Sequence, residues 1–227
     1  MKLIVANKNH SSWSLRPWVL MTTLGIPFEE ELVPFAGLDN REAFRAFSPG
    51  GTVPCLVDGA QTIWGSLAIL LYLADRHEAV WPSDLSARVW AQSVTCEMHS
   101  GFASLRNDCT MNVGMRVQPR AQSAALARDV ARIREIFEEG LERFGGPYLA
   151  GANFTAADAF FAPVVFRIRT YCLVMGPLGS AWVERMLAEP AMGAWEEAAL
   201  AETYREEGHE AELATAGMVT ADYRARA

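Results

Sequence analysis

The chain has 227 residues, enough for one large domain or for two small domains that share an interface. Hydrophobic residues make up 51% and charged residues 21%, a composition typical of globular proteins that excludes disorder along the whole chain. The net charge of −7 disfavours nucleic acid and anionic membrane surfaces as main partners, because both attract clustered lysine and arginine. We expect a small molecule or another protein as the partner.

Signals for a membrane, for secretion and for metal binding are weak. The longest apolar segments, such as 67–73 and 160–166, are much shorter than the roughly 20 residues that span a bilayer. The apolar start of the chain meets polar residues at Asn7, too early for a secretory signal. The four cysteines form no C-x-x-C motif, and Cys96 and His99 lack a third ligand at a definable spacing. We therefore expect a cytoplasmic protein with reduced thiols, no bound metal and no membrane partner.

The first 78 residues alternate between strand and helix patterns. A short apolar run is followed by apolar residues at helical spacing, which end at Gly25. Asp58 and Gly59 separate two further apolar runs, a pattern typical of a β-hairpin, and Ser66 is placed to cap an apolar helix. The predicted elements are strands at 2–6 and 29–33, helices at 13–24 and 66–75, a helical turn at 41–47, and hairpin strands at 54–58 and 62–64.

From residue 86 onward the pattern predicts helices only. Two long segments carry one apolar stripe each, with apolar side chains three and four residues apart. The first stripe consists of Trp90, Val94, Met98, Phe102 and Leu105, and the second runs from Leu126 to Phe144. We predict an α/β domain at 1–78, a linker at 79–85, an all-helical domain at 86–200, and the end of a helix with a tail at 201–227.

Residues 155–158 have the pattern of a capping box at the start of a helix. The side chain of Thr155 can accept from the backbone N–H near Asp158, and the Asp158 carboxylate can reach back to the N–H of Thr155. By itself this pattern indicates only a well-started helix.

Four such features occur in one order along the chain: a serine pair after the first strand, Val53-Pro54 before the hairpin, Ser66 opening a helix, and the capping box at Thr155. With this order and spacing, the chain up to about residue 200 resembles the cytosolic glutathione transferase family, in its serine-type, zeta-like or related bacterial branch. The resemblance implies a thioredoxin-like first domain, an all-α helical second domain, glutathione as co-substrate, and a homodimer.

The resemblance places a catalytic hydroxyl in the loop after the first strand. Alignment of Arg16 with the arginine that follows the serine in similar proteins puts the catalytic position at Ser11, with Ser12 as the second candidate. Such a hydroxyl donates a hydrogen bond to the sulfur of glutathione and stabilises the thiolate, lowering a thiol pKa that is about 8.5 when unperturbed. The alternative is that both serines only cap the helix. His10 has no acid in its own loop to orient it, so we interpret it as a solvated side chain rather than a general base.

The resemblance also implies contacts to the rest of glutathione. The backbone of Val53, before a cis bond to Pro54, would pair with the cysteinyl part, unless the proline is trans and only opens a strand. Ser66 would hold the γ-glutamyl carboxylate at a helix N-terminus, beside a plain capping role. Gly65 stands where family members usually carry an acid that holds the γ-glutamyl ammonium, so we expect weakened but retained binding. The implied glutathione-binding set is Trp13, Leu38, Val53, Pro54, Gly65 and Ser66.

An acceptor pocket is implied between the two domains. Flexible thioether side chains would suit its apolar wall, although each of these residues is also a normal core residue. Arginines near the wall could attract an acidic substrate, or could simply face water. The candidates for the wall are Met98, Phe102, Met111, Met115 and Tyr171, and the arginines are Arg106, Arg116, Arg167 and Arg169.

The function implied is that of a glutathione transferase, which joins the glutathione sulfur to an electrophilic carbon of an apolar or acidic organic molecule, in a biosynthetic or catabolic pathway. One alternative is glutathione-dependent cis–trans isomerisation, as in the zeta-like branch, to which the serine pair is similar. The other is a non-catalytic binding protein, for which Gly65 is the best argument. The presence of Ser11, Ser12, Val53, Pro54 and Ser66 together favours an enzyme.

Overall fold

The structure of the protein is a computed structural model that describes residues 1–37 and 39–225. The first domain contains one mixed sheet of four strands in the order β2-β1-β3-β4. β1 pairs with β2 in parallel and with β3 antiparallel, and β3 and β4 form the predicted hairpin, which turns at Gly59 with a φ of +56°. The strands are β1 (Lys2–Val5), β2 (Glu29–Leu32), β3 (Cys55–Asp58) and β4 (Gln61–Trp64).

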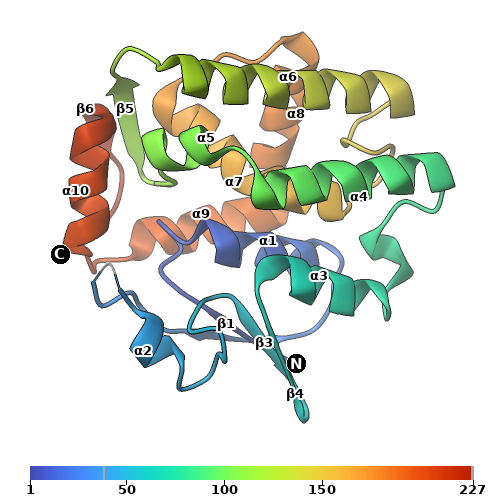
Figure 1. Ribbon diagram of the computed structural model, residues 1–227, viewed down its shortest axis with the longest axis horizontal. Coiled ribbons are helices and arrows are strands. Elements are labelled where there is room, and N and C mark those ends of the chain that lie inside the picture. The colour runs from blue at the N-terminus through green and yellow to red at the C-terminus, as the bar shows by residue number, and fades with distance from the viewer. Residues whose placement is uncertain (38, 226–227) are drawn as a thin grey trace.

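The helices of the first domain cover the sheet and connect it to the second domain. They are α1 (Ser12–Thr23), α2 (Arg41–Phe44) and α3 (Ser66–Ala74), followed by the short 3-10 helix η1 (Glu78–Val80). Figure 1 shows α1 and α3 between the sheet and the helices of the second domain. Strand, helix, strand, short helix, hairpin and helix follow each other as the sequence predicts, and the thioredoxin-like arrangement is confirmed.

One detail at the start of α3 differs from the prediction. Ser66 was predicted to cap this helix, but Gly65 is the N-cap residue and Ser66 is the first residue of the helix. Gly65 has a φ of +85° and a ψ of 132°, a backbone conformation that glycine adopts readily and other residues rarely. The chain therefore turns into the helix at the glycine, and the serine side chain points from the first helical position.

The second domain is mostly helical, and its helices were predicted, but it also contains a small sheet. β5 (Met115–Pro119) pairs antiparallel with β6 (Gly217–Asp222), so the predictions of helices only after residue 86 and of a tail at the end of the chain are wrong. The two strands lie about a hundred residues apart in the sequence, so their pairing leaves no local pattern. The helices are α4 (Leu85–Ser100), α5 (Ala103–Asp108), α6 (Ala124–Phe144), α7 (Ala156–Tyr171), α8 (Pro177–Ala188), α9 (Pro190–Ala201) and α10 (Glu207–Ala216). Within the described ranges, no helix is long and apolar enough to span a bilayer.

The first apolar stripe of this domain is interrupted. α4 ends at Ser100, and Phe102 takes a left-handed conformation with a φ of +60° as the N-cap residue of α5. The stripe that the sequence suggests as one helix thus belongs to two helices, with Gly101 between them.

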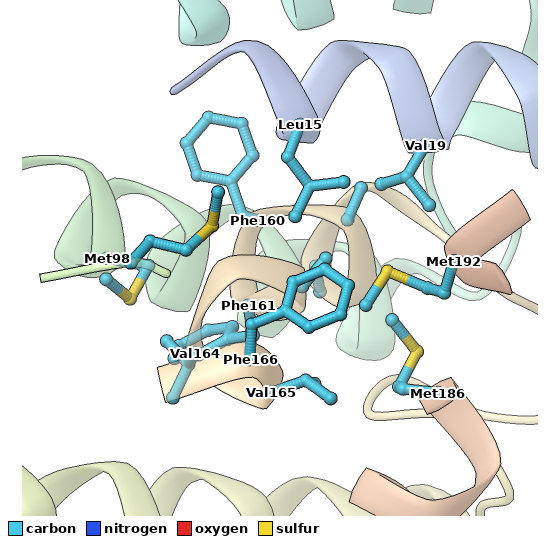
Figure 2. Packing of buried hydrophobic residues seen from close by; sticks show 14 of the residues in the cluster. Leu15, Val19, Met98, Phe160, Phe161, Val164, Val165, Phe166, Met186 and Met192 are labelled. Atoms are coloured by element: carbon cyan, nitrogen blue, oxygen red, sulfur yellow. The ribbon is translucent and has the colours of Figure 1, made fainter. Parts of the chain in front are cut away.

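Helix α7 lies at the centre of the core and joins the two domains. Nearly all of its side chains are buried, and it packs against both α1 and α4. Figure 2 shows Leu15 and Val19 of α1 facing Phe160 and Phe161 of α7. Because α1 also packs against α9, the helix that follows the serine loop is fixed by apolar contacts to the second domain.

The predicted capping box starts α7 and is buried. The backbone N–H of Thr155 donates to Oδ2 of Asp158 over 3.0 Å. The other carboxylate oxygen, Oδ1, accepts from the N–H of Leu149 and from the indole N–H of Trp182, each over 2.9 Å. Asp158 therefore ties α7 to the preceding loop and to α8, beyond the local role that the sequence pattern indicates.

Candidate active site

A cavity of about 440 Å³ lies between the two domains and brings several predicted site residues together. From the first domain, its wall includes Ser11, Ser12, Trp13 and Val53, which lie in the loop after β1, at the start of α1 and before β3. From the second domain, the wall includes Arg106, Met111 and Arg167, together with His209 of α10.

The remaining predicted residues that the structure describes lie outside the wall of this cavity. Met98, Phe102, Met115 and Tyr171 are buried core residues, and the Tyr171 hydroxyl donates to the carbonyl oxygen of Thr110 over 2.9 Å. Leu38 falls outside the described residues. Pro54, Gly65 and Ser66 belong to the neighbouring segment around β3, β4 and the start of α3.

The two serines of the loop have different surroundings. The Ser11 hydroxyl donates to the Oγ of Ser14 over 2.7 Å and is engaged within the protein. The Ser12 hydroxyl has no hydrogen-bond partner among the described residues, and Ser12 is 8% exposed. Ser12 is also the first residue of α1, where the first-turn amides lack acceptors within the helix and the dipole favours negative charge. The free hydroxyl that can face an anion in the cavity is thus that of Ser12.

The loop that carries the serines is held by the second domain. The side chain of Glu202, just after α9, accepts from the backbone N–H of Lys8 over 2.6 Å and from that of Asn9 over 3.2 Å. The indole N–H of Trp195 donates to the carbonyl oxygen of Lys8 over 2.9 Å, and Oδ1 of Asn9 accepts from the N–H of Gly114 over 3.0 Å. None of these contacts has a local signal in the sequence, because each joins segments far apart in the chain.

The segment around Val53 and Ser66 shows two features that suit a bound ligand. The Val53–Pro54 bond is cis, as predicted. The Ser66 hydroxyl is buried and has no hydrogen-bond partner among the described residues, an arrangement that is costly unless a ligand or water supplies a partner. At Gly65 there is open space within 4 Å of the position that a Cβ would take. That the missing acid at Gly65 weakens the hold on a γ-glutamyl ammonium stays a prediction.

Three arginines, Arg16, Arg106 and Arg167, lie near one another, and two of them contact Trp13. The guanidinium carbons of Arg16 and Arg106 lie 4.0 and 4.7 Å from the centre of a Trp13 ring. Arg167 is 5% exposed and donates to the carbonyl oxygens of Leu105 and Cys109 at the end of α5. No ion pair among the described residues involves any of the three arginines, although Asp39 and Glu212 also line the cavity.

Burial and repulsion between the guanidinium groups disfavour the charged forms of these arginines. Burial, followed by the charges of Arg106 and Arg167, lowers the pKa of Arg16. Burial, followed by the charge of Arg106, lowers the pKa of Arg167 to about 10. In addition, Nη1 of Arg16 and Nη1 of Arg106 are buried with no hydrogen-bond partner among the described residues. An anion in the cavity beside Arg106 and Arg167 would supply the missing charge and an acceptor for the unpaired Nη1 of Arg106.

The two other arginines that the sequence suggested are engaged elsewhere. Arg169 forms an ion pair with Glu196 of α9, with 2.6 Å between Nη2 and Oε1. Arg116 donates to the carbonyl oxygens of Val113 and Met115 and lies over the ring of Tyr223. Arg16, which the sequence marked only as an alignment point, joins the cluster instead, because α1 packs against α7.

Comparison with known proteins finds two matching domains of one family. Residues 10–76 match the family model of the glutathione S-transferase N-terminal domain, and residues 123–198 match that of the C-terminal domain. Glutathione S-transferase 3 of Zea mays is 28% identical over 193 residues, which cover 78% of this chain and 85% of the maize protein.

Solved structures of the same fold include two bacterial enzymes. The theta class glutathione S-transferase of Xanthomonas axonopodis pv. citri, solved with glutathione bound, has a TM-score of 0.64 and 23% identity over 88% of this chain and 97% of its own. A bacterial maleylpyruvate isomerase of the zeta class has a TM-score of 0.66 and 23% identity over 88% of this chain and 98% of its own. The two matched domains together cover more than half of the sequence, and the fold agrees with both of them. The chain therefore belongs to the glutathione S-transferase family of enzymes.

Proposed function

We propose that this protein binds glutathione, holds its sulfur as a thiolate beside Ser12, and joins that sulfur to an electrophilic carbon of an organic molecule that carries an anionic group. The observation that supports the proposal most strongly is the cavity, whose wall includes Ser12 with its free hydroxyl, Arg106 and Arg167. The buried, unpartnered hydroxyl of Ser66 supports a ligand that extends along the start of α3.

The chemistry required of Ser12 is modest. A hydrogen bond from its hydroxyl to the sulfur, together with the positive end of α1, stabilises the thiolate relative to the thiol. A lowering of the thiol pKa by two units corresponds to about 2.7 kcal/mol in favour of the anion. The thiolate then attacks the acceptor, and the arginines hold the anionic group of the acceptor so that its electrophilic carbon faces the sulfur.

Replacing Ser12 by alanine tests this proposal. We expect Ser12→Ala to lower kcat/KM with glutathione and chlorodinitrobenzene by about ten- to a hundredfold, because one hydrogen bond to a charged group contributes about 1.5–3 kcal/mol. Ser11→Ala is the matched control, and we expect a change of less than about threefold, because the Ser11 hydroxyl is turned toward Ser14. If the wild-type protein consumes no glutathione, or if both variants match an active wild type, the proposed role of the hydroxyl is wrong.

Glutathione-dependent cis–trans isomerisation is a second candidate. The zeta-class maleylpyruvate isomerase described above has this fold, and an arginine-rich cavity would suit an unsaturated acid. The first step would be the same, since the thiolate adds to a conjugated double bond and is expelled after rotation about the single bond. The two outcomes differ in whether glutathione is consumed, which an assay of free thiol with a cis-unsaturated diacid as the acceptor measures.

We also propose that the protein is a homodimer, as the family resemblance implies. Large apolar side chains are exposed on three elements that could form a common interface: Trp64 on β4 and Leu71 on α3 are 46% and 51% exposed, and Leu85 and Val89 on α4 are 64% and 54% exposed. Exposed apolar side chains of this size on neighbouring elements are typical of an interaction surface. We expect sedimentation equilibrium to give twice the chain mass of 25.0 kDa, and a monomer at micromolar concentration would contradict the proposal.

A further inference from the structure

The C-terminal helix contributes a histidine to the cavity. α10 lies on the same side of the molecule as α2, as Figure 1 shows, and His209 of α10 lines the cavity together with Ser11 and Ser12. The imidazole ring of His209 stacks on that of His10, with 4.8 Å between the ring centres and 26° between the planes. It also contacts the ring of Phe35, with 4.9 Å between the centres. The ring is therefore held between two other rings rather than free in solvent.

A carboxylate orients His209. Nδ1 of His209 lies 2.6 Å from Oε2 of Glu206, the N-cap residue of α10. Glu206 is 5% exposed, and its two oxygens also accept from the backbone N–H of Gly208 over 3.0 Å and from that of His209 over 2.8 Å. Burial raises the pKa of Glu206, but the hydrogen bonds from these amides and from the imidazole outweigh it, so the pKa is lowered and the carboxyl group is ionised at neutral pH.

This arrangement determines which ring nitrogen is available. A carboxylate on Nδ1 favours the tautomer that carries its proton there, so that Nε2 presents a lone pair. Nε2 has no hydrogen-bond partner among the described residues and is not among their buried, unpartnered atoms. An imidazole oriented in this way can take a proton at Nε2 and give it up again.

His10, which adjoins Ser11, lacks these properties, and its side chain is buried rather than solvated as the sequence suggests. Its side chain is 6% exposed, against 21% for His209. Burial, followed by the neighbouring His209, lowers the pKa of His10 to about 4, so His10 is neutral at physiological pH. The nearest carboxylate, Oε1 of Glu210, lies 3.7 Å from Nε2 of His10. A neutral, buried His10 supports the ring of His209 and places it next to the serine loop.

The other charged groups around the pair are engaged. Nη2 of Arg224 donates to Oε2 of Glu210 over 3.0 Å and to Oδ2 of Asp222 over 2.9 Å. Glu206 is thus the carboxylate that forms a hydrogen bond with Nδ1 of His209. The titratable and charged groups that face the two histidines from the packed elements are Glu206, Glu210 and Glu212 of the α10 segment, Arg205 before it, Arg224 after β6, and Asp39 and Arg41 beside α2.

We propose that Glu206 and His209 form a proton-transfer dyad for the reaction in the cavity, in which His209 is a catalytic residue and Glu206 a positioning residue. This inference rests on the proposed function. Nε2 of His209 takes the thiol proton as the sulfur becomes a thiolate. When the thiolate adds to the β-carbon of a conjugated carbonyl compound, the carbon–sulfur bond forms, the π electrons move to the carbonyl oxygen as an enolate, and Nε2–H returns the proton to the α-carbon. Glutathione adds across the double bond, and neither an oxidant nor a reductant is needed.

The test uses the full-length protein and ethacrynic acid, an anionic conjugated ketone, as the acceptor. We expect His209→Ala to lower kcat by about a hundredfold, the lower range for general acid–base catalysis, with little change in the KM for glutathione. Added imidazole should restore at least about tenfold of the lost kcat, because it can occupy the place of the missing ring. His77→Ala, at a histidine between α3 and η1, is the matched control and should behave as the wild type. Glu206→Gln should lower kcat by about tenfold without rescue by imidazole, because the ring of His209 is still present.

Each other outcome contradicts the dyad. If kcat of His209→Ala is within twofold of the wild type, or if the loss is in KM, His209 does not transfer the proton. A loss of kcat that imidazole does not restore is what a purely structural role gives, and it overturns the proposal as well. If the wild type itself consumes no glutathione with ethacrynic acid or chlorodinitrobenzene, the proposed function and the dyad fail together. An active wild type matched by His209→Ala overturns the dyad alone.

Discussion

Replacing Asp158 by asparagine is expected to lower the free energy of unfolding at pH 4 by about 3–5 kcal/mol, the upper range for breaking a buried hydrogen-bond network. Both carboxylate oxygens accept from donors, namely the N–H groups of Leu149 and Thr155 and the indole N–H of Trp182. Either oxygen of the carboxyl group can accept, and a proton bound to it can turn away from these donors, whereas the amide N–H₂ of an asparagine must face one of them. Denaturant unfolding of the wild type and the variant measures the difference.

The effect of this substitution depends on pH. Asp158 is fully buried, and burial raises its pKa from 3.8 to about 6, against the hydrogen bonds from Leu149, Trp182 and Thr155 that lower it. Because the folded protein holds this proton more tightly than the unfolded chain, the contribution of Asp158 to stability is full below pH 3.8 and is lost as the pH rises to about 6. Asparagine does not titrate, so we expect the difference between wild type and Asp158→Asn to be larger at pH 4 than at pH 7.

A control separates this effect from the loss of any acidic residue. Asp75, after α3, is exposed, and Asp75→Asn should change the free energy of unfolding by less than about 0.5 kcal/mol at both pH values. A difference between wild type and Asp158→Asn that is the same at pH 4 and pH 7 would show that the carboxyl group of Asp158 does not titrate between them in the folded protein.

Replacing Arg167 by methionine is expected to reduce the preference of the protein for an anionic acceptor over a neutral one. We expect the ratio of kcat/KM for ethacrynic acid to that for its neutral methyl ester to fall by about a hundredfold. A buried charge-assisted contact contributes about 2–5 kcal/mol, and a loss of about 2.7 kcal/mol is a hundredfold change. The ester has the same shape near the reacting carbon but no charge for the guanidinium to bind, so its kcat/KM reports everything except the anion contact.

Arg167 also has a structural role, which the ratio removes from the measurement. Its guanidinium donates to carbonyl oxygens at the end of α5, so Arg167→Met will also lower the stability of the protein. Both acceptors are assayed with the same preparation of enzyme. A smaller folded fraction lowers both kcat/KM values equally, so the ratio of the two values does not change. Arg132→Met is the matched control, because Arg132 pairs with Glu97 at 2.8 Å and does not line the cavity. If Arg167→Met lowers both acceptors equally, Arg167 serves only α5 and the anionic acceptor is wrong.

The local patterns of the sequence were sufficient for most of the first domain and for the start of α7. The β-hairpin at Asp58-Gly59, the helix after the serine loop and the capping box at Thr155 all lie where the sequence predicts them, because each depends on residues within a few positions of one another. The assignment of Ser66 as the cap of α3 failed by one residue, since the backbone conformation of Gly65 decides where that helix begins.

Local sequence patterns do not predict which hydroxyl of the serine pair is free. The sequence indicates a hydroxyl at the start of α1 and favours Ser11 over Ser12 by alignment alone. Whether a hydroxyl is free depends on a neighbour in the folded helix, here Ser14, whose Oγ lies 2.7 Å from that of Ser11. The structure therefore supports Ser12 as the residue that faces a thiolate, and only the assay of both variants tests the choice.

The sequence by itself indicated the family, the order of strands and helices in the first domain, and two segments of the cavity wall, the serine loop and the segment around Val53, because these follow from periodicity, turn residues and the order of short motifs. The tertiary structure alone decided which side chains meet: Arg16 with Arg106 and Arg167, Glu202 with the serine loop, and His209 with His10. These contacts join segments that lie far apart in the chain, and they exist only because α7 packs on α1 and because α10 folds back over the first domain. Hydrophobic periodicity specifies which face of a helix is buried, but not which distant polar groups are brought together when it is buried.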